Sequence, residues 1–298
     1  MNRFLLAALI PAIALPCHAA PAPERPEIFG IAYVKFKTTN VEKARQFYGT
    51  IVGLQTQGGS CAGVPGPCFA VNDQQHIELV PTNPGTTGPY LVEIAFSVNN
   101  LNQMATFLTA NHIPTSKILR RPDGAPYLEL LDPEHNKIVF VEKRGEPNSG
   151  YSESAISHKI IHAGFVTKDA DLENKFYEDL LGFHPYWKGG RTDGDIDWFM
   201  NQVPNGDNWI EYMLNIPANA DHRELGIQDH LSLGVQNVDS VAVVLKSRGA
   251  DFPKPITGRD GKRQLTLFDP DQTRIEVMEF APVETPCCSP YNGPHPKP

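Results

Sequence analysis

Residues 162–183 read HAGFVTKDADLENKFYEDLLGF, and residues 31–54 read IAYVKFKTTNVEKARQFYGTIVGL. The two stretches align without gaps on their Phe-Tyr pairs, at 47–48 and 176–177. Each begins with alternating apolar residues, continues through a polar corner with an Asx residue, and then takes on helical spacing. This order predicts a strand followed by a capped amphipathic helix, present twice in the chain.

A second pair of stretches repeats in the same way, at residues 92–113 and 230–252. Each is followed by a strand, an Asp-Pro turn and an alternating strand, over residues 128–143 and 265–280. Proline fixes φ and aspartate bonds back to the chain, so Asp-Pro before polar residues predicts a turn. The chain is therefore predicted to be α+β, built from four βαβββ modules that pair into two domains.

The composition of the connecting segments sets the domain limits. We predict an N-terminal domain over 28–143 and a C-terminal domain over 158–280. Between them, residues 144–157 are polar and contain Gly, Pro and Ser, which is typical of a linker. The tail, 281–298, is too rich in proline for regular structure.

The first residues have the pattern of a secretory signal. Arg3 precedes an apolar run over 4–15, and Cys17-His18-Ala19 supplies a small-x-small cleavage site. The run is too short to cross a bilayer, which favours a cleaved signal, 1–19, over a retained N-terminal anchor. The mature protein is therefore expected to be periplasmic or secreted.

Export changes the interpretation of the cysteines. Cys61, Cys68, Cys287 and Cys288 form an even set, and disulfides are the expected state in an oxidising compartment. A local bridge would close the loop between Cys61 and Cys68, whereas the cysteines of the tail could tie it to the body. Four cysteines allow three pairings, and the sequence leaves all three open.

Charge restricts the class of partner. The formal net charge of −8 over 298 residues argues against a nucleic-acid surface, and no basic amphipathic stretch suggests membrane association after signal cleavage. The predicted partner is a small molecule. The oligomeric state stays open.

Equivalent positions of the repeat carry the candidate chemistry. The start of the first strand and the middle of the last strand hold His162 and Glu211 in the third module, and His230 and Glu276 in the fourth. A glutamate inside an apolar strand is costly unless it is paired or bound to a cation. Two His with two Glu at matching positions therefore predict a metal site.

The N-terminal half has other residues at these positions. They are Tyr33 and Glu78 in the first module, and Glu93 and Val139 in the second. Two carboxylates without imidazoles do not make a metal site, so this half is predicted to be a degenerate structural copy without metal.

Paired βαβββ modules with ligands on their first and last strands resemble the vicinal oxygen chelate superfamily, which includes glyoxalase I, extradiol dioxygenases and bleomycin-resistance proteins. The ending DPDQTRIEVMEF, residues 269–280, is similar to the DPDGN-x-IE ending common in that family. The resemblance implies glyoxalase-like domains and one divalent metal (Fe, Mn, Ni, Co or Zn). It matches His162, His230 and Glu276 to metal ligands, and Glu211 to a fourth ligand or a base beside the metal. Glu211 and Glu276 are then the candidate catalytic carboxylates.

The resemblance leaves three functions open. Four candidate ligands favour glyoxalase-like lyase or isomerase chemistry through a metal-stabilised enediolate. The four-module length favours an extradiol Fe(II) dioxygenase, although Thr266 stands where those enzymes usually have a tyrosine. The third alternative is a non-catalytic binding protein of the bleomycin-resistance kind, which would not need the four ligands.

Two further interpretations concern side chains near the candidate ligands. Five aromatic residues of the third module could line a pocket over the metal or form its core, and the sequence does not choose; they are Tyr186, Trp187, Trp198, Phe199 and Trp209. His76 is expected to be an ordinary exposed histidine.

Overall fold

The structure is a computed structural model that describes residues 23–56, 61, 63–88, 90–122, 124–142 and 152–298. The predicted signal segment and most of the predicted linker lie outside these residues. Within the described residues, no helix is long and apolar enough to cross a bilayer.

The N-terminal half forms one seven-stranded sheet with the strand order β2-β3-β1-β4-β7-β6-β5. Its strands are β1 (Ile28–Thr38), β2 (Cys68–Ala70), β3 (His76–Pro81), β4 (Leu91–Val98), β5 (Leu119–Arg120), β6 (Pro126–Leu131) and β7 (Lys137–Glu142). Its helices are α1 (Val41–Arg45), which continues into the π-helical η1 (Gln46–Ile51), and α2 (Leu101–Ala110).

The C-terminal half forms an eight-stranded sheet with the order β13-β14-β15-β12-β8-β11-β10-β9. Its strands are β8 (Ile160–Val166), β9 (His184–Gly189), β10 (Trp198–Gln202), β11 (Trp209–Met213), β12 (His230–Val235), β13 (Ile256–Thr257), β14 (Arg263–Phe268) and β15 (Arg274–Glu279). Its helices are α3 (Ala170–Asn174), continued by the π-helical η3 (Lys175–Leu180), α4 (His222–Gln228) and α5 (Val238–Ser247).

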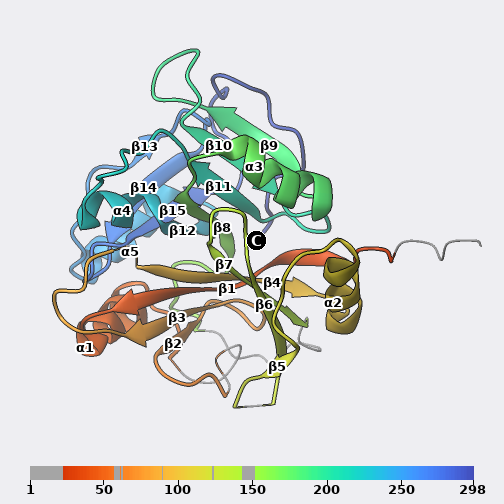
Figure 1. The fold of residues 1–298 in the computed structure, drawn as a ribbon. Helices are drawn as coiled ribbons and strands as arrows, with labels where there is room; N and C mark the ends of the chain where they lie inside the picture. Colours follow the sequence, from red (N-terminus) through yellow and green to blue (C-terminus); the bar gives the residue numbers. More distant parts are fainter. Residues whose placement is uncertain (1–22, 57–60, 62, 89, 123, 143–151) are drawn as a thin grey trace, which may run out of the picture.

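Two curled mixed sheets with few helices confirm the predicted α+β class (Figure 1). In each half the first strands of the two modules, β1 with β4 and β8 with β12, pair antiparallel at the centre. The first module departs from the pattern, because its described residues have an isolated bridge between Gln55 and Ala70 where the third module has β9.

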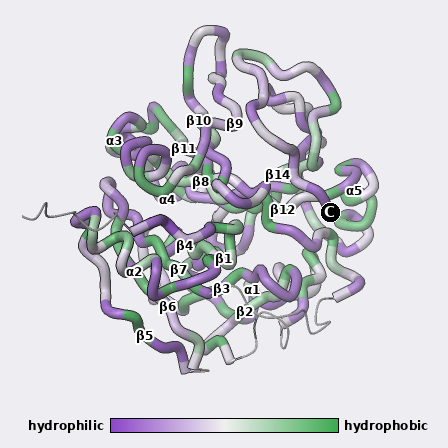
Figure 2. Tube along the Cα trace, turned by 90° about the vertical axis from the view of Figure 1, so that its right-hand side faces the viewer, coloured by the Kyte–Doolittle hydropathy of each residue, from purple (hydrophilic) through white to green (hydrophobic). Residues whose placement is uncertain are grey.

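The Asx residues found in the repeat begin the helices. Asn40, Asn100, Asp169 and Asn237 each accept a backbone N–H from the first turn of the following helix. These bonds satisfy donors that the first turn leaves free. Figure 2 shows hydrophobic and hydrophilic stretches alternating along the chain of both halves, as expected where each element buries one face.

The two halves are joined by the same residues that align the repeat. The Tyr48 hydroxyl donates to Asp269 Oδ2 at 3.0 Å, and the Tyr177 hydroxyl donates to Asp132 Oδ2 at 3.1 Å. Each bond links a Phe-Tyr pair in one half to an Asp-Pro turn in the other. The first module therefore meets the fourth and the second meets the third, as a pseudo-twofold arrangement requires.

Both disulfides are local. Cys61 is bonded to Cys68, and Cys287 to its neighbour Cys288. The tail, residues 281–298, forms no helix or strand and is nevertheless anchored to the C-terminal half. Trp187 Nε1 donates to Cys287 O at 3.2 Å, and the Tyr291 hydroxyl donates to Asp260 Oδ2 at 3.1 Å.

Candidate metal centre

Four neighbouring strands bring the candidate ligands together. His162 lies in β8, and His230 lies opposite Gly164 on the adjacent β12. Glu211 comes from β11, which runs parallel to β8, and Glu276 from β15, which runs parallel to β12. Any side chain larger than hydrogen at Gly164 would overlap the His230 ring, so this glycine makes room for the imidazole.

The ligand atoms lie close to one another. His162 Nε2 is 3.0 Å from His230 Nε2 and 3.2 Å from Glu276 Oε2. Glu211 Oε2 is 3.3 Å from His230 Nε2 and 3.5 Å from His162 Nε2. His162, His230 and Glu276 form the one group of three or more such ligands found among the described residues, and all three are buried.

These separations suit a transition metal. Ligands bonded at about 2.1 Å and at right angles are about 3 Å apart, which is the spacing seen here. His230 Nδ1 lies 2.7 Å from the carbonyl oxygen of Gln228, an acceptor, so that nitrogen carries the proton and Nε2 is left as a free donor to a metal. Two buried imidazoles and two carboxylates facing one point match the ligands of Fe, Mn, Ni, Co or Zn.

The electrostatics keep the ligands in their metal-binding forms. Burial lowers the pKa of His230, and the nearby Arg274 guanidinium lowers it further, so the imidazole stays neutral. Burial alone would raise the pKa of Glu276, but Arg274 and His162 bring it down to about 2, so the carboxyl stays ionised.

Arg274 was not anticipated from the sequence. Its Nη2 lies 2.6 Å from His230 Nε2, and its Nη1 lies 3.7 Å from Glu276 Oε1. A signal was present, because residues two apart on a strand share a face, and Arg274 precedes Glu276 by two positions in β15.

Comparison with known proteins identifies the family. The model of the Glyoxalase/Bleomycin resistance protein/Dioxygenase superfamily matches residues 159–277, which include all four candidate ligands. The C-terminal half of the chain belongs to this superfamily. The match confirms the resemblance to vicinal oxygen chelate proteins.

The proteins that this chain resembles include two kinds of enzyme. A lactoylglutathione lyase from Schizosaccharomyces pombe is 23% identical over 62% of this chain, and the chain spans only 65% of that protein. A variant of homoprotocatechuate 2,3-dioxygenase from Brevibacterium fuscum superposes with a TM-score of 0.63 at 18% identity, over 87% of this chain and 73% of the other. The 2,3-dioxygenase LapB from Pseudomonas sp. KL28 gives 0.65 at 14% identity, over 92% and 96%. These structures share the fold.

A small cavity adjoins the candidate metal centre. It measures about 80 Å³, and both Glu211 and Glu276 reach its wall. Trp187, Trp198 and Met200 supply its apolar side. The aromatic residues that the sequence could not assign to pocket or core therefore fall into both groups. Trp187 and Trp198 line the cavity, whereas Tyr186 and Trp209 are buried in the core behind the site.

The layer behind the metal centre also contains a buried cation. The Lys262 side chain is fully buried and donates from Nζ to the carbonyl of Phe280 at 2.5 Å. Its ammonium lies 5.0 Å from the Trp209 ring centroid, and that ring packs on His162 at 4.8 Å. Tyr291 of the tail completes this layer, with Lys262 5.5 Å from its ring.

The equivalent positions of the N-terminal half hold a cluster of ion pairs. Lys35 Nζ lies 2.8 Å from Glu78 and 2.6 Å from Glu93, and Arg121 lies 2.8 Å from Glu78. Lys35 aligns with Gly164, so a lysine ammonium stands where the other half has space for an imidazole. The expectation that His76 is exposed was wrong: it is 3% exposed and lies 2.9 Å from Glu78.

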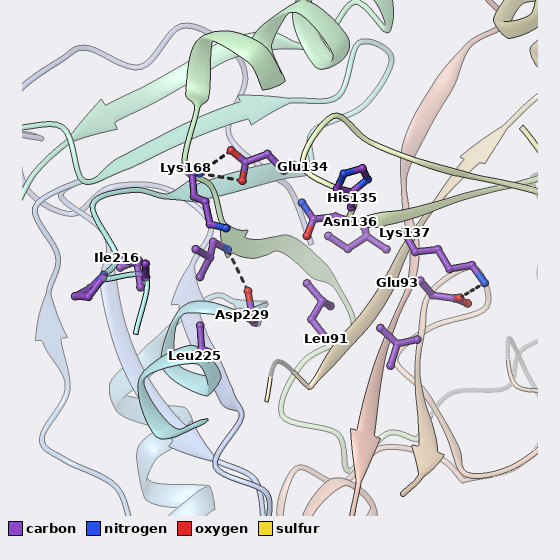
Figure 3. A pocket seen from close by; sticks show the side chains of 15 residues that line it. Leu91, Glu93, Glu134, His135, Asn136, Lys137, Lys168, Ile216, Leu225 and Asp229 are labelled. Atoms are coloured by element: carbon purple, nitrogen blue, oxygen red, sulfur yellow. Dashed lines mark hydrogen bonds and ion pairs between the residues drawn. The ribbon is translucent and has the colours of Figure 1, made fainter. Parts of the chain in front are cut away.

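A larger cavity of about 350 Å³ lies between the halves and not at the metal centre (Figure 3). Leu91 and Lys137 line it from the N-terminal half, and Lys168 and Asp229 from the C-terminal half. Asp229 immediately precedes His230 in extended conformation, and adjacent extended residues point to opposite faces. The cavity is therefore behind the strand that carries His230.

Proposed function

We propose that this protein is a metal-dependent enzyme of glyoxalase-like lyase or isomerase type, acting on a small molecule with two neighbouring oxygens. The observation that carries the proposal is the second carboxylate: Glu211 Oε2 lies within 3.5 Å of both imidazole Nε2 atoms. A site with Glu211 in addition to His162, His230 and Glu276 has one carboxylate available for proton transfer. The lactoylglutathione lyase relationship supports the same class.

Different residues of the site would bind the metal, transfer the proton and exclude water in such a reaction. His162, His230 and Glu276 would hold a divalent metal, which when bound supplies Lewis-acid stabilisation to vicinal oxygens of a substrate. Glu211 reaches the cavity wall, where its carboxylate can take a proton from the carbon beside a carbonyl and return it to the neighbouring atom. Trp187 and Trp198 exclude water from the apolar side of the cavity.

Metal content tests the proposal. Protein purified without chelators is expected to contain near-stoichiometric Fe, Mn, Ni, Co or Zn by elemental analysis, and a His162→Ala/His230→Ala variant is expected to lose it. His158→Ala/His184→Ala is the matched control, since neither histidine belongs to the close ligand group. A metal-free wild type, even after reconstitution, would mean a binding protein instead.

An extradiol-type Fe(II) dioxygenase is the second candidate, favoured by the two-His-one-carboxylate group and the two-domain fold. Against it, Thr266 pairs directly with Glu276 across β14 and β15 and offers no phenol there. Oxygen uptake by the Fe(II)-loaded protein on a panel of catechols decides between the two. Uptake that is lost in the His162→Ala/His230→Ala variant would replace the lyase proposal with the dioxygenase.

We also propose that the protein acts outside the cytoplasm. Two disulfides, which form and persist in oxidising compartments, support this. N-terminal sequencing of periplasmic and culture fractions is expected to find chains that begin after Ala19 or Ala20. Full-length chains confined to the cytoplasm would contradict it.

A further inference from the structure

Arg274 lies in the wall of the cavity, and the reaction proposed above gives its side chain no role. Its side chain is 16% exposed and enters the cavity wall from β15, two residues before Glu276. Its buried Nε has no hydrogen-bond partner among the described residues. A guanidinium carries five N–H donors, and a donor left without an acceptor in a desolvated site costs free energy.

The guanidinium and a metal compete for the same atom. His230 Nδ1 carries its proton toward the Gln228 carbonyl, so Nε2 has a single lone pair, which accepts from Arg274 in this structure. A metal bound by His230 would take that lone pair, and the 2.6 Å contact with Arg274 would be given up. Among the described residues, the contact then left to the Arg274 guanidinium is Glu276 Oε1 at 3.7 Å, while Glu276 Oε2 faces His162.

With a metal bound, the charges around the cavity leave the Arg274 guanidinium without a matching carboxylate. A divalent metal would be balanced by Glu211 and Glu276. The other cavity arginine, Arg259, already pairs with Asp193, and the buried Lys262 is accompanied by Asp260. Among the described residues that line the cavity, Arg274 is thus the cation without a carboxylate of its own once the metal is bound.

We infer that Arg274 binds a carboxylate of the substrate, so that the substrate class is a small acid whose carboxylate lies beside its vicinal oxygens. The inference rests on the proposed metal-dependent function. A planar guanidinium accepts a carboxylate through two parallel bonds, which suits it to this role better than lysine.

The first arm of the test measures metal affinity without turnover. Chelator-stripped wild type, Arg274→Met and Arg274→Lys are titrated with Zn²⁺ against a competing dye. Removing both a competitor for Nε2 and a like charge is expected to tighten Zn²⁺ binding by at least about tenfold in Arg274→Met. Arg263→Met is the matched control. Arg263 lies on β14, pairs with the exposed Asp239 of α5 and is not among the residues that line the cavity. Unchanged or weaker Zn²⁺ binding in Arg274→Met would overturn the inference.

The second arm measures ligand preference by calorimetry on the Zn²⁺-loaded proteins. Catechol is compared with 2,3-dihydroxybenzoate, and hydroxyacetone with hydroxypyruvate, so that each pair differs by one carboxylate. The acids are expected to bind wild type and the Arg263→Met control about tenfold more tightly than their neutral partners, and this preference is expected to be lost in Arg274→Met and partly kept in Arg274→Lys. Equal preference in wild type and Arg274→Met would overturn the inference alone. Failure of the wild type to take up Zn²⁺ would overturn the proposed function with it.

Discussion

Position 164 and its equivalent, position 35, show how one residue decides what a repeat of this kind can hold. Gly164 leaves space for the His230 ring beside it. Lys35 fills that space in the other half, and its ammonium contacts both Glu78 and Glu93. A glycine at this position therefore leaves room for two imidazoles that could bind a metal, whereas a lysine there places a cation between two carboxylates.

Replacing Gly164 with alanine is predicted to damage the metal centre more than the fold. The added methyl group would push the His230 ring away from His162, so Zn²⁺ affinity should fall by at least about tenfold, with about 1–3 kcal/mol lost from the free energy of unfolding. Dye competition and urea denaturation measure the two effects. Ser232→Ala is the control, since Ser232 faces His162 on the same strands and its buried hydroxyl has no partner among the described residues. Wild-type Zn²⁺ affinity in Gly164→Ala would contradict the assignment.

The sequence could predict the four ligand candidates because equivalent repeat positions can be compared within one chain. It could not place Arg274 at the site, because the contact between Arg274 and the His230 ring depends on the folded structure. The burial of His76 was missed for a similar reason. Strand pairing brings Tyr33 against His76, and Glu78 lies on the same face of β3 two residues further on. Pairing across a sheet cannot be read from one strand alone.

At the scale of elements, α3 carries a carboxyl group that does not suit its surroundings. Glu173 is fully buried, and its Oε1 accepts the backbone N–H of Glu134 at 2.9 Å. Its Oε2 has no hydrogen-bond partner among the described residues. Burial, and then repulsion from Asp132, raise the pKa of Glu173 to about 8.

This shift predicts a pH-dependent gain on replacing Glu173 with glutamine. Below about pH 4.5 the carboxyl is protonated in folded and unfolded chains alike, and it contributes nothing. Between there and about pH 8 only the unfolded chain ionises, so the folded state loses stability as pH rises. Glu173→Gln should therefore melt about 3 °C or more above wild type at pH 8, with a smaller gain at pH 5. Asp171→Asn, an exposed change on the same helix, is the control, and an equal gain at both pH values would contradict the burial argument.

The existence of the main helices and most strands followed from periodicity and caps, but their finer form did not. The Asx residues at 40 and 169 begin helices as predicted, and Asn100 and Asn237 cap the helices of the other two modules in the same way. Nothing in the apolar spacing indicated the π-helical turns η1 and η3, which contain the two Phe-Tyr pairs. A π-turn adds a residue without changing the amphipathic pattern enough to be seen.

At the scale of the whole molecule, the repeat is also the means by which the halves are held together. The tyrosines and Asp-Pro turns that align the modules within the sequence form bonds between the halves in space. Acidic residues two positions after each Asp repeat the arrangement: Asp271 accepts the Thr39 N–H, and Glu134 accepts the Lys168 N–H. Sequence comparison could find these residues but not their partners, because each partner lies more than 30 positions away in the chain.

The pseudo-twofold arrangement predicts that its two tyrosine bonds are equivalent in energy and independent of the metal. Removing either hydroxyl leaves a buried carboxyl with one donor fewer, so Tyr48→Phe and Tyr177→Phe should each lower the free energy of unfolding by about 1–2 kcal/mol. The bonds have no partner in common, so the double variant should lose roughly the sum, with unchanged metal content. Urea denaturation measures the loss, and Tyr90→Phe, whose hydroxyl bonds to Thr86 O within one half, is the control with a smaller expected effect. A double variant no less stable than Tyr90→Phe would show that these two bonds contribute nothing to holding the halves together. A loss confined to one tyrosine would show that the two equivalent bonds differ in energy.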